Sequence, residues 1–418
     1  KYGDVPLILK AFNSTSDPEI TKPRDSRESV IQQCYKDLEF AAQWLPTRAT
    51  LPESDWGRLT RSAALALSLR IGLYEGTYIK YHNLTEGDSK AHLKKAIDAA
   101  EAVMKEGHSL YPNYQTLFYF DAEGPANKEN IFVKIYGPNG AGTVTHGNSR
   151  QMENSVSVTR QMIDLYLYED GLPKEKSTLR ISPETSYDDA LKFRDPRLSM
   201  TIFKIGEDAY KGSYIPLANQ SGNGYSLKKG FILSEWQTNS KETVDKMLIR
   251  YGEELISYAE ALYEYNGTIT DTQLDATVIM LRKRAGFNAK LSNAFVTNNG
   301  LSMIEEIRRE RSVELIDEGF RYDDIIRWKI AENVLPKAIL GAKFIEGESS
   351  TKRDEISGRL TSENGMYNGA KIYDEADIYV IERADTRSFD PNRDYLYPIP
   401  LEEISLSNNN VKQNPNWE

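Results

Sequence analysis

Residues Met303 to Trp328 read MIEEIRRERSVELIDEGFRYDDIIRW, and this stretch decides the fold. It combines five arginines and eight carboxylates with an apolar stripe. In a helix, Ile304, Ile307, Arg311 and Leu315 fall on one face at spacings of three and four residues. The spacing therefore predicts a helix whose buried face includes the guanidinium of Arg311.

A buried guanidinium needs carboxylates to accept its hydrogen bonds, because burying an unpaired charge is costly. Glu310, Glu314 and Glu318 are near enough in sequence to accept them. We predict a structural ion-pair clamp between two helices, with Gly319 ending the first and Asp323 starting the second. A catalytic carboxylate pair is the alternative. It is disfavoured because so many arginines would hold the carboxylates ionised.

The composition is that of a folded globular protein. Charged residues make up 27% of the 418 residues, and the net charge is −10. This charge argues against nucleic-acid binding, which requires clustered lysine and arginine, and no apolar run is long enough to span a membrane. The sequence starts at Lys1 without a methionine, so we expect targeting signals to lie outside it. The single cysteine, Cys34, excludes an internal disulfide and is predicted to be a buried small hydrophobe.

Amphipathic helices are predicted mainly in residues 25–110 and 245–335. Pro46 ends the first of them, Thr60 can cap the second, and Gly107 follows the third. Alanines alternate with large Leu and Tyr residues on their packing faces, as in tetratricopeptide-like helix pairs. We predict a mostly α-helical scaffold of irregular helix pairs. The helical stripes also place Trp44 and Trp328 in the core.

The other regions, 111–244 and 336–418, are predicted to form a loop-rich half of the same single domain, 1–418. They are rich in Gly, Asn, Ser and Thr, with short strands expected at 200–205 and 230–233 and an extended wrap at 394–418. Long loops in a compact protein are usually functional. We therefore expect the loop-rich half to carry the ligand site.

The aromatic residues indicate a polar ligand with apolar faces, such as a sugar. The chain has 25 tyrosines and 5 tryptophans, whose flat rings can cover the C–H face of a pyranose while polar side chains bond its hydroxyls. Several of them lie in polar loops, and packing onto their own domain is the alternative for each. The predicted ligand-binding residues are Trp236, Tyr225, Tyr214, Tyr210, Trp56 and Asn223. No catalytic motif, metal-binding motif or cofactor is predicted.

Five blocks of sequence, in order along the chain, resemble the SusD/RagB family of outer-membrane nutrient-binding lipoproteins. They are Tyr2–Leu7, Cys34–Pro46, Arg250–Gly286, Glu310–Trp328 and Tyr397–Pro415. Each block alone is a weak signal, whereas all five in order are specific. Members of this family normally have a lipoprotein signal, an acylated cysteine and further helices before the first block, and this sequence contains none of them.

This resemblance implies tetratricopeptide-like helix pairs packed against a loop-rich half that holds the ligand. It also implies a non-enzymatic protein on the extracellular face of the outer membrane, attached by a lipid anchor that is not in this chain. Such a protein binds a nutrient glycan and delivers it to a SusC-like TonB-dependent transporter.

Three other functions remain open from the sequence. A peptide-binding member would share the fold, and a deep pocket with charged groups would favour peptide over an oligosaccharide. A glycoside hydrolase would need two carboxylates facing each other across a cleft. A tetratricopeptide adaptor would bind no small ligand.

Overall fold

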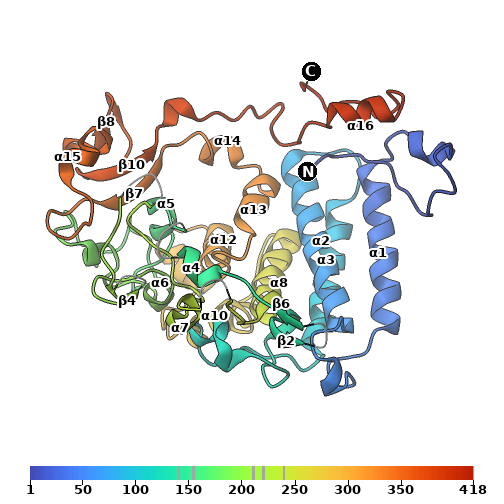
Figure 1. The fold of residues 1–418 in the computed structure, drawn as a ribbon, viewed down its shortest axis with the longest axis horizontal. Helices are drawn as coiled ribbons and strands as arrows, with labels where there is room; N and C mark the ends of the chain where they lie inside the picture. Colours follow the sequence, from blue (N-terminus) through green and yellow to red (C-terminus); the bar gives the residue numbers. More distant parts are fainter. Residues whose placement is uncertain (140–141, 153–155, 210–211, 219–221, 239–240, 418) are drawn as a thin grey trace.

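The helical half is a stack of long helices. The computed structural model describes residues 1–417 except 140–141, 153–155, 210–211, 219–221 and 239–240. Its main helices are α1 (Arg27–Trp44), α2 (Arg61–His82), α3 (Ser89–Met104), α8 (Tyr251–Asn266) and α12 (Met303–Glu314). Helix α2 packs against α1 and α3, α3 packs against α8, and α8 packs against α12 (Figure 1). The predicted mostly helical fold is confirmed.

Shorter helices continue the scaffold and cross the loop-rich half. They are α4 (Asn148–Met152), α5 (Arg160–Ile163), α6 (Pro196–Thr201), α7 (Leu233–Trp236), α9 (Asp271–Asp275), α10 (Val278–Arg284), α11 (Asn293–Asn298), α13 (Arg321–Arg327), α14 (Ala331–Val334), α15 (Arg353–Ile356) and α16 (Leu401–Leu406).

Every strand pair that the structure describes is a small antiparallel one. The pairs are β1 (Asn130–Lys134) with β6 (Lys246–Arg250), β2 (Gly137–Asn139) with β3 (Gly142–Val144), β4 (Asp208–Ala209) with β5 (Gly212–Ser213), β7 (Ile339–Lys343) with β10 (Ile378–Glu382), and β8 (Met366–Tyr367) with β9 (Ala370–Lys371). The β1–β6 pair joins the two halves, because β6 leads directly into α8.

The main apolar core lies between the long helices. Leu69, Leu93, Leu255 and Ile307 are all almost fully buried in it. Small residues let the helix axes approach: a Cβ on Gly72 of α2 would lie 2.7 Å from a backbone oxygen of α3. Helices that approach this closely bury a continuous core, and they form a rigid support for the loops.

A second core lies in the loop-rich half and consists largely of aromatic residues. Tyr187, Phe203, Tyr214 and Tyr225 are all buried in it, and Tyr214 stacks on Phe203 with ring centroids 5.1 Å apart. This core is hard to recognise in the sequence, because the loops around it are rich in polar residues.

Arg311 is buried as predicted, but its partners are different ones. Its guanidinium donates to Asp324 Oδ2 and to Ser257 Oγ, both at 2.8 Å. The clamp therefore joins α12 to α13 and α8. Trp328, which follows α13, is buried as predicted.

The carboxylates first assigned to Arg311 serve a neighbouring ionic cluster. Arg197 contacts Glu310 at 2.7 Å and Glu314 at 2.9 Å, and Arg250 contacts Glu314 and Glu318. Glu310 and Glu314 on α12, and Glu318 beyond its end, are already paired with arginines of α6, α10 and β6.

Four local predictions are wrong. Residues 200–205 begin inside α6, because Asp195 caps that helix and Pro196 occupies its first turn. Residues 230–233 lead into α7 and form no strand. Trp44 is 70% exposed at the end of α1, and Cys34 on α1 is half-buried rather than buried. Helix α1 packs mainly on α2, with side-chain contacts from Tyr35 and Glu39 to α3, and Tyr35 is its one buried residue.

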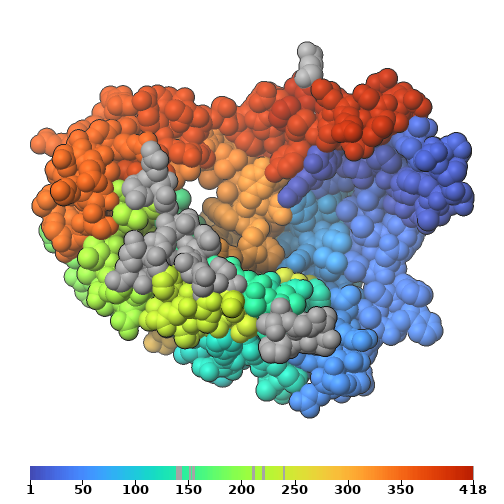
Figure 2. Space-filling view, in the orientation of Figure 1, coloured from blue at the N-terminus to red at the C-terminus, as the bar shows by residue number. Residues whose placement is uncertain are grey.

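The two ends of the chain lie together. The amide of Tyr397 donates to the carbonyl of Lys1 at 2.8 Å, and Asn414 donates to the carbonyl of Tyr2 at 3.0 Å. Figure 2 shows the red C-terminal residues lying along the blue N-terminal ones. The predicted wrap exists, although α16 interrupts it. Among the described residues, the helices are too short or too polar to cross a bilayer.

Candidate functional site

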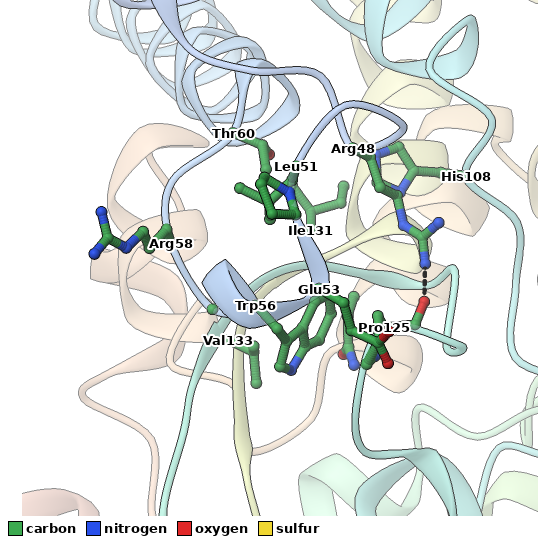
Figure 3. Close-up of a pocket in the computed structure, with 13 residues that line it drawn as sticks. Arg48, Leu51, Glu53, Trp56, Arg58, Thr60, His108, Pro125, Ile131 and Val133 are labelled. Carbon is green, nitrogen blue, oxygen red and sulfur yellow. Dashed lines mark hydrogen bonds between the residues drawn. The ribbon is translucent and has the colours of Figure 1, made fainter. Parts of the chain in front are cut away.

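The loop between α1 and α2 presents Trp56 beside a small cavity. The loop turns at Gly57, whose φ of 91° favours glycine. A Cβ on Gly57 would also lie 2.5 Å from Ile135 Cδ1, so an added side chain would require Ile135, in the chain beyond β1, to shift. In Figure 3 the half-buried indole of Trp56 lies beside Val133, and Arg58 points away from the cavity.

The cavity has a volume of about 60 Å³ and mixed walls. Its lining includes Arg48, Leu51, Pro52, Glu53, Trp56, Thr60, His108, Pro125, Asn130, Ile131 and Val133. This is room for about two water molecules. A sugar hydroxyl or a small substituent fits this space, whereas a whole pyranose ring does not.

Three buried polar atoms of residues that line this cavity have no hydrogen-bond partner among the described residues. They are Trp56 Nε1, Arg48 Nε and Asn130 Oδ1, and all three atoms are buried. Buried polar groups almost always have a partner, from protein or from ordered water. Two donors and one acceptor around one cavity match a hydroxyl group, which both donates and accepts.

Arg48 and His108 form the inner wall. Arg48 Nη2 donates to the carbonyl of Pro125, shown as the dashed line in Figure 3. His108 shares a hydrogen bond of 2.8 Å with Ser62 Oγ. Burial lowers the pKa of both groups below their ordinary values, so His108 is neutral at neutral pH.

Three other predicted ligand residues are structural in this fold. Tyr225 is 1% exposed and accepts a hydrogen bond from Arg160 at 2.9 Å. Tyr214 is 2% exposed and donates to the carbonyl of Gly224 at 3.1 Å. Asn223 is also buried, and its side chain accepts from the amide of Tyr225. Protein covers both rings, so they offer no open face to a sugar.

Trp236 and Tyr210 complete the predicted set. Trp236 ends α7, is half-buried and packs against the aromatic core of the loop-rich half. Tyr210 lies outside the described residues. The structure does not gather the five described residues of this set into one site, and among those five Trp56 is the one that lines the small cavity.

A second, larger cavity, which we call the lysine cavity, lies where β6 and the end of α12 meet. Its volume is about 260 Å³. Charged side chains make up half of its lining, which is Phe118, Asn148, Met152, Lys229, Gly230, Asp245, Lys246, Met247, Leu248, Arg250, Glu253, Asp317, Glu318 and Phe320. Sequence reasoning missed this site, because no local motif links Lys246 to Asp317.

No described group of three or more His, Cys, Asp or Glu residues is placed to hold a metal ion. The carboxylates of α12 are also unlike a hydrolytic pair. Burial alone would raise the pKa of Glu314, but Arg284, Arg250 and Arg197 together hold it at about 2. A carboxylate kept ionised in this way cannot donate a proton at neutral pH.

Comparison with known proteins identifies the family. The model of the SusD family matches residues 125–417. The chain belongs to the SusD family. Proteins of this family bind carbohydrates and are not enzymes.

Individual SusD-like proteins are distant in sequence. A SusD-like protein of Formosa agariphila, called P2, is 23% identical over the whole chain and 70% of its own length. A solved SusD-like carbohydrate binding protein of Bacteroides fragilis is 25% identical, with a TM-score of 0.72 over 97% of this chain and 75% of its own. Surface glycan-binding protein A of Bacteroides fluxus shares the fold at 17% identity, with a TM-score of 0.59 over 100% of this chain and 74% of its own.

Proposed function

We propose that this SusD-family protein captures a nutrient glycan at the cell surface and hands it to a TonB-dependent transporter. In this proposal a lipid anchor holds it on the extracellular face of the outer membrane. Family membership supports glycan binding, and the Bacteroides fragilis relative named as a carbohydrate binding protein aligns over nearly the whole chain.

The observation that supports a binding site at the Trp56 cavity is its set of unpartnered polar atoms beside an indole. A sugar ring would lie at the mouth against the half-buried Trp56. One of its hydroxyls would enter the cavity and bond Trp56 Nε1, Arg48 Nε or Asn130 Oδ1. Few direct contacts suit a protein that must release its ligand again.

Affinity electrophoresis against a panel of polysaccharides, followed by calorimetry on the glycan bound, tests this proposal. Trp56→Ala should weaken binding by at least about tenfold, because an aromatic contact and a hydrogen bond are lost together. Trp44→Ala is the matched control, since it removes an exposed tryptophan that does not line the cavity. Equal glycan affinity of Trp56→Ala and wild type would show that the glycan does not bind at the Trp56 cavity.

The handover step needs a separate experiment. The protein, expressed with its natural anchor, should copurify with an outer-membrane transporter from detergent-solubilised membranes. Purification without any transporter would argue against delivery and would leave glycan binding standing.

A further inference from the structure

Only some of the charged side chains that line the lysine cavity form ion pairs. Arg250 and Lys229 are both paired with Glu318, at 2.7 Å and 2.6 Å. Glu253 is paired with Arg70. These pairs account for two of the three cations and two of the four carboxylates that line the cavity.

Lys246 and Asp317 are the charged lining residues that remain unpaired. Within the described part of the chain, neither side chain makes a hydrogen bond or an ion pair, although both line the same cavity. Asp245, the remaining carboxylate, accepts a hydrogen bond from the amide of Tyr136 at 2.8 Å through one of its oxygens.

Both unpaired charges are partly withdrawn from solvent. Asp317 is exposed as a residue, yet burial of its carboxyl group raises its pKa. Lys246 is half-buried at the start of β6, and burial lowers the pKa of its ammonium. A charge removed from water without a partner is destabilising. A ligand that brings an anionic group to Lys246 and hydroxyl donors to Asp317 would compensate both charges.

The walls and size of the cavity suit a single sugar unit. A volume of about 260 Å³ lies just below the range typical of small-molecule pockets. Phe118 and Phe320 supply aromatic surface, and Met152 and Met247 add apolar surface. Sugar hydroxyls can donate to the free carboxylate oxygens of Asp317 and Asp245.

We propose that the lysine cavity binds the carboxylate of an acidic sugar, such as a uronic acid, through Lys246, with hydroxyls of the same unit donating to Asp317. This assignment rests on the proposed glycan-binding function and narrows it to acidic glycans. The net charge of −10 gives no general attraction for a polyanion. Selectivity for acidic glycans therefore depends on this one ammonium.

A comparison of each acidic glycan with its carboxyl-reduced form tests the proposal on the wild-type protein. The probes are oligosaccharides of polygalacturonate, alginate and hyaluronan, each beside the neutral sugar obtained by reducing its carboxylates to alcohols. At least one acidic probe should bind at least about tenfold more tightly than its reduced form, because a hydrogen bond between two charged groups is stronger than one to an alcohol.

Two lysine variants test whether Lys246 causes the preference for the acidic form. Lys246→Met should abolish the preference for the acidic form while the melting temperature stays at or above that of wild type. Lys134→Met is the matched control and should keep the preference, because Lys134 pairs with Lys246 across the β1–β6 ladder but is exposed and does not line the cavity.

The other outcomes are distinguishable. Equal binding of acidic and reduced forms, or a preference that survives in Lys246→Met, overturns this inference and leaves glycan binding standing. Binding of peptides in place of all glycans overturns both proposals, as does the absence of binding to any acidic or neutral glycan.

Discussion

Arg327 holds Glu260 through two parallel hydrogen bonds, Nη1 to Oε1 at 2.6 Å and Nη2 to Oε2 at 2.7 Å. The indole of Trp328 donates to the same carboxylate at 2.7 Å. Glu260 is on α8 and Arg327 is on α13, and both are almost completely buried. The pair therefore fixes α13, and the chain that follows it, against the centre of the helical stack.

Glu260→Ala should destabilise the protein by about 3–5 kcal/mol, because it leaves the Arg327 guanidinium buried without its main partner. Urea denaturation measures the change. Asp98→Ala is the control, since Asp98 forms an exposed ion pair with Lys94 and should change stability by less than about 1 kcal/mol. Similar values for the two variants would show that the buried pair contributes no more than a surface one.

The buried glutamates also predict acid sensitivity. Burial alone would raise the pKa of Glu260, but Arg327, Arg311 and Arg308 hold it at about 2, well below its ordinary value of 4.5. The unfolded chain therefore binds protons that the folded protein does not bind. The stability from this carboxylate is fully present above pH 4.5 and is lost as the pH falls from 4.5 to about 2. Denaturation between pH 2 and 5 should show this slope, and Glu260→Gln should reduce it.

His82 predicts a second pH range in which the stability of the fold changes. Its ring stacks on Tyr78 with centroids 3.9 Å apart, and burial lowers its pKa from 6.5 to about 4. Between these values the unfolded state takes up a proton that the folded state does not, so stability falls as the pH falls from 6.5 to 4. His82→Phe should flatten the stability curve in this window only. A variant curve parallel to that of wild type would show that His82 titrates normally.

Gly57→Ala should disturb the Trp56 loop without affecting the helical core. The left-handed φ of Gly57 and the closeness of Ile135 both oppose a side chain there. We expect a loss of about 1–2 kcal/mol in stability and weaker glycan binding. Gly107→Ala is a control with a similar φ of 79° and nothing within 4 Å of the added Cβ. It should lose stability but keep glycan affinity.

The helical scaffold could be predicted because its signals are local. The spacing of Ile307, Arg311 and Leu315 depends only on helix geometry. The partners of Arg311 could not be predicted in the same way. Ser257 is 54 residues away and Asp324 is 13 residues away across a turn, and only the packing of α8 and α13 brings them to Arg311.

The site was harder to predict than the fold, because the same residue types serve both structure and binding. Tyr225 and Tyr214 lie in a glycine- and asparagine-rich segment, yet that segment folds inward and buries them. Trp56 lies in a loop of similar polarity but remains half-buried at a cavity. Whether a loop turns inward or outward depends on contacts that are distant in sequence, so composition alone cannot separate these cases.

Glu254 on α8 predicts a stabilising substitution. It is 1% exposed, and both of its carboxylate oxygens are buried without a hydrogen-bond partner in the described part of the chain. Burial, with the neighbouring charge of Glu253, raises its pKa well above 4.5. The folded state therefore keeps a proton that the unfolded state releases, and stability falls as the pH rises above 4.5.

Glu254→Met removes this penalty while roughly keeping the side-chain volume. At pH 7 the variant should be more stable than wild type by about 1–4 kcal/mol, and the advantage should shrink as the pH falls to 4. Glu253→Met is the matched control on the same helix. Glu253 is paired with Arg70, so its replacement should destabilise the protein at pH 7. Urea denaturation of both variants at pH 4 and pH 7 checks the prediction, and a loss of stability in Glu254→Met at both pH values would contradict it.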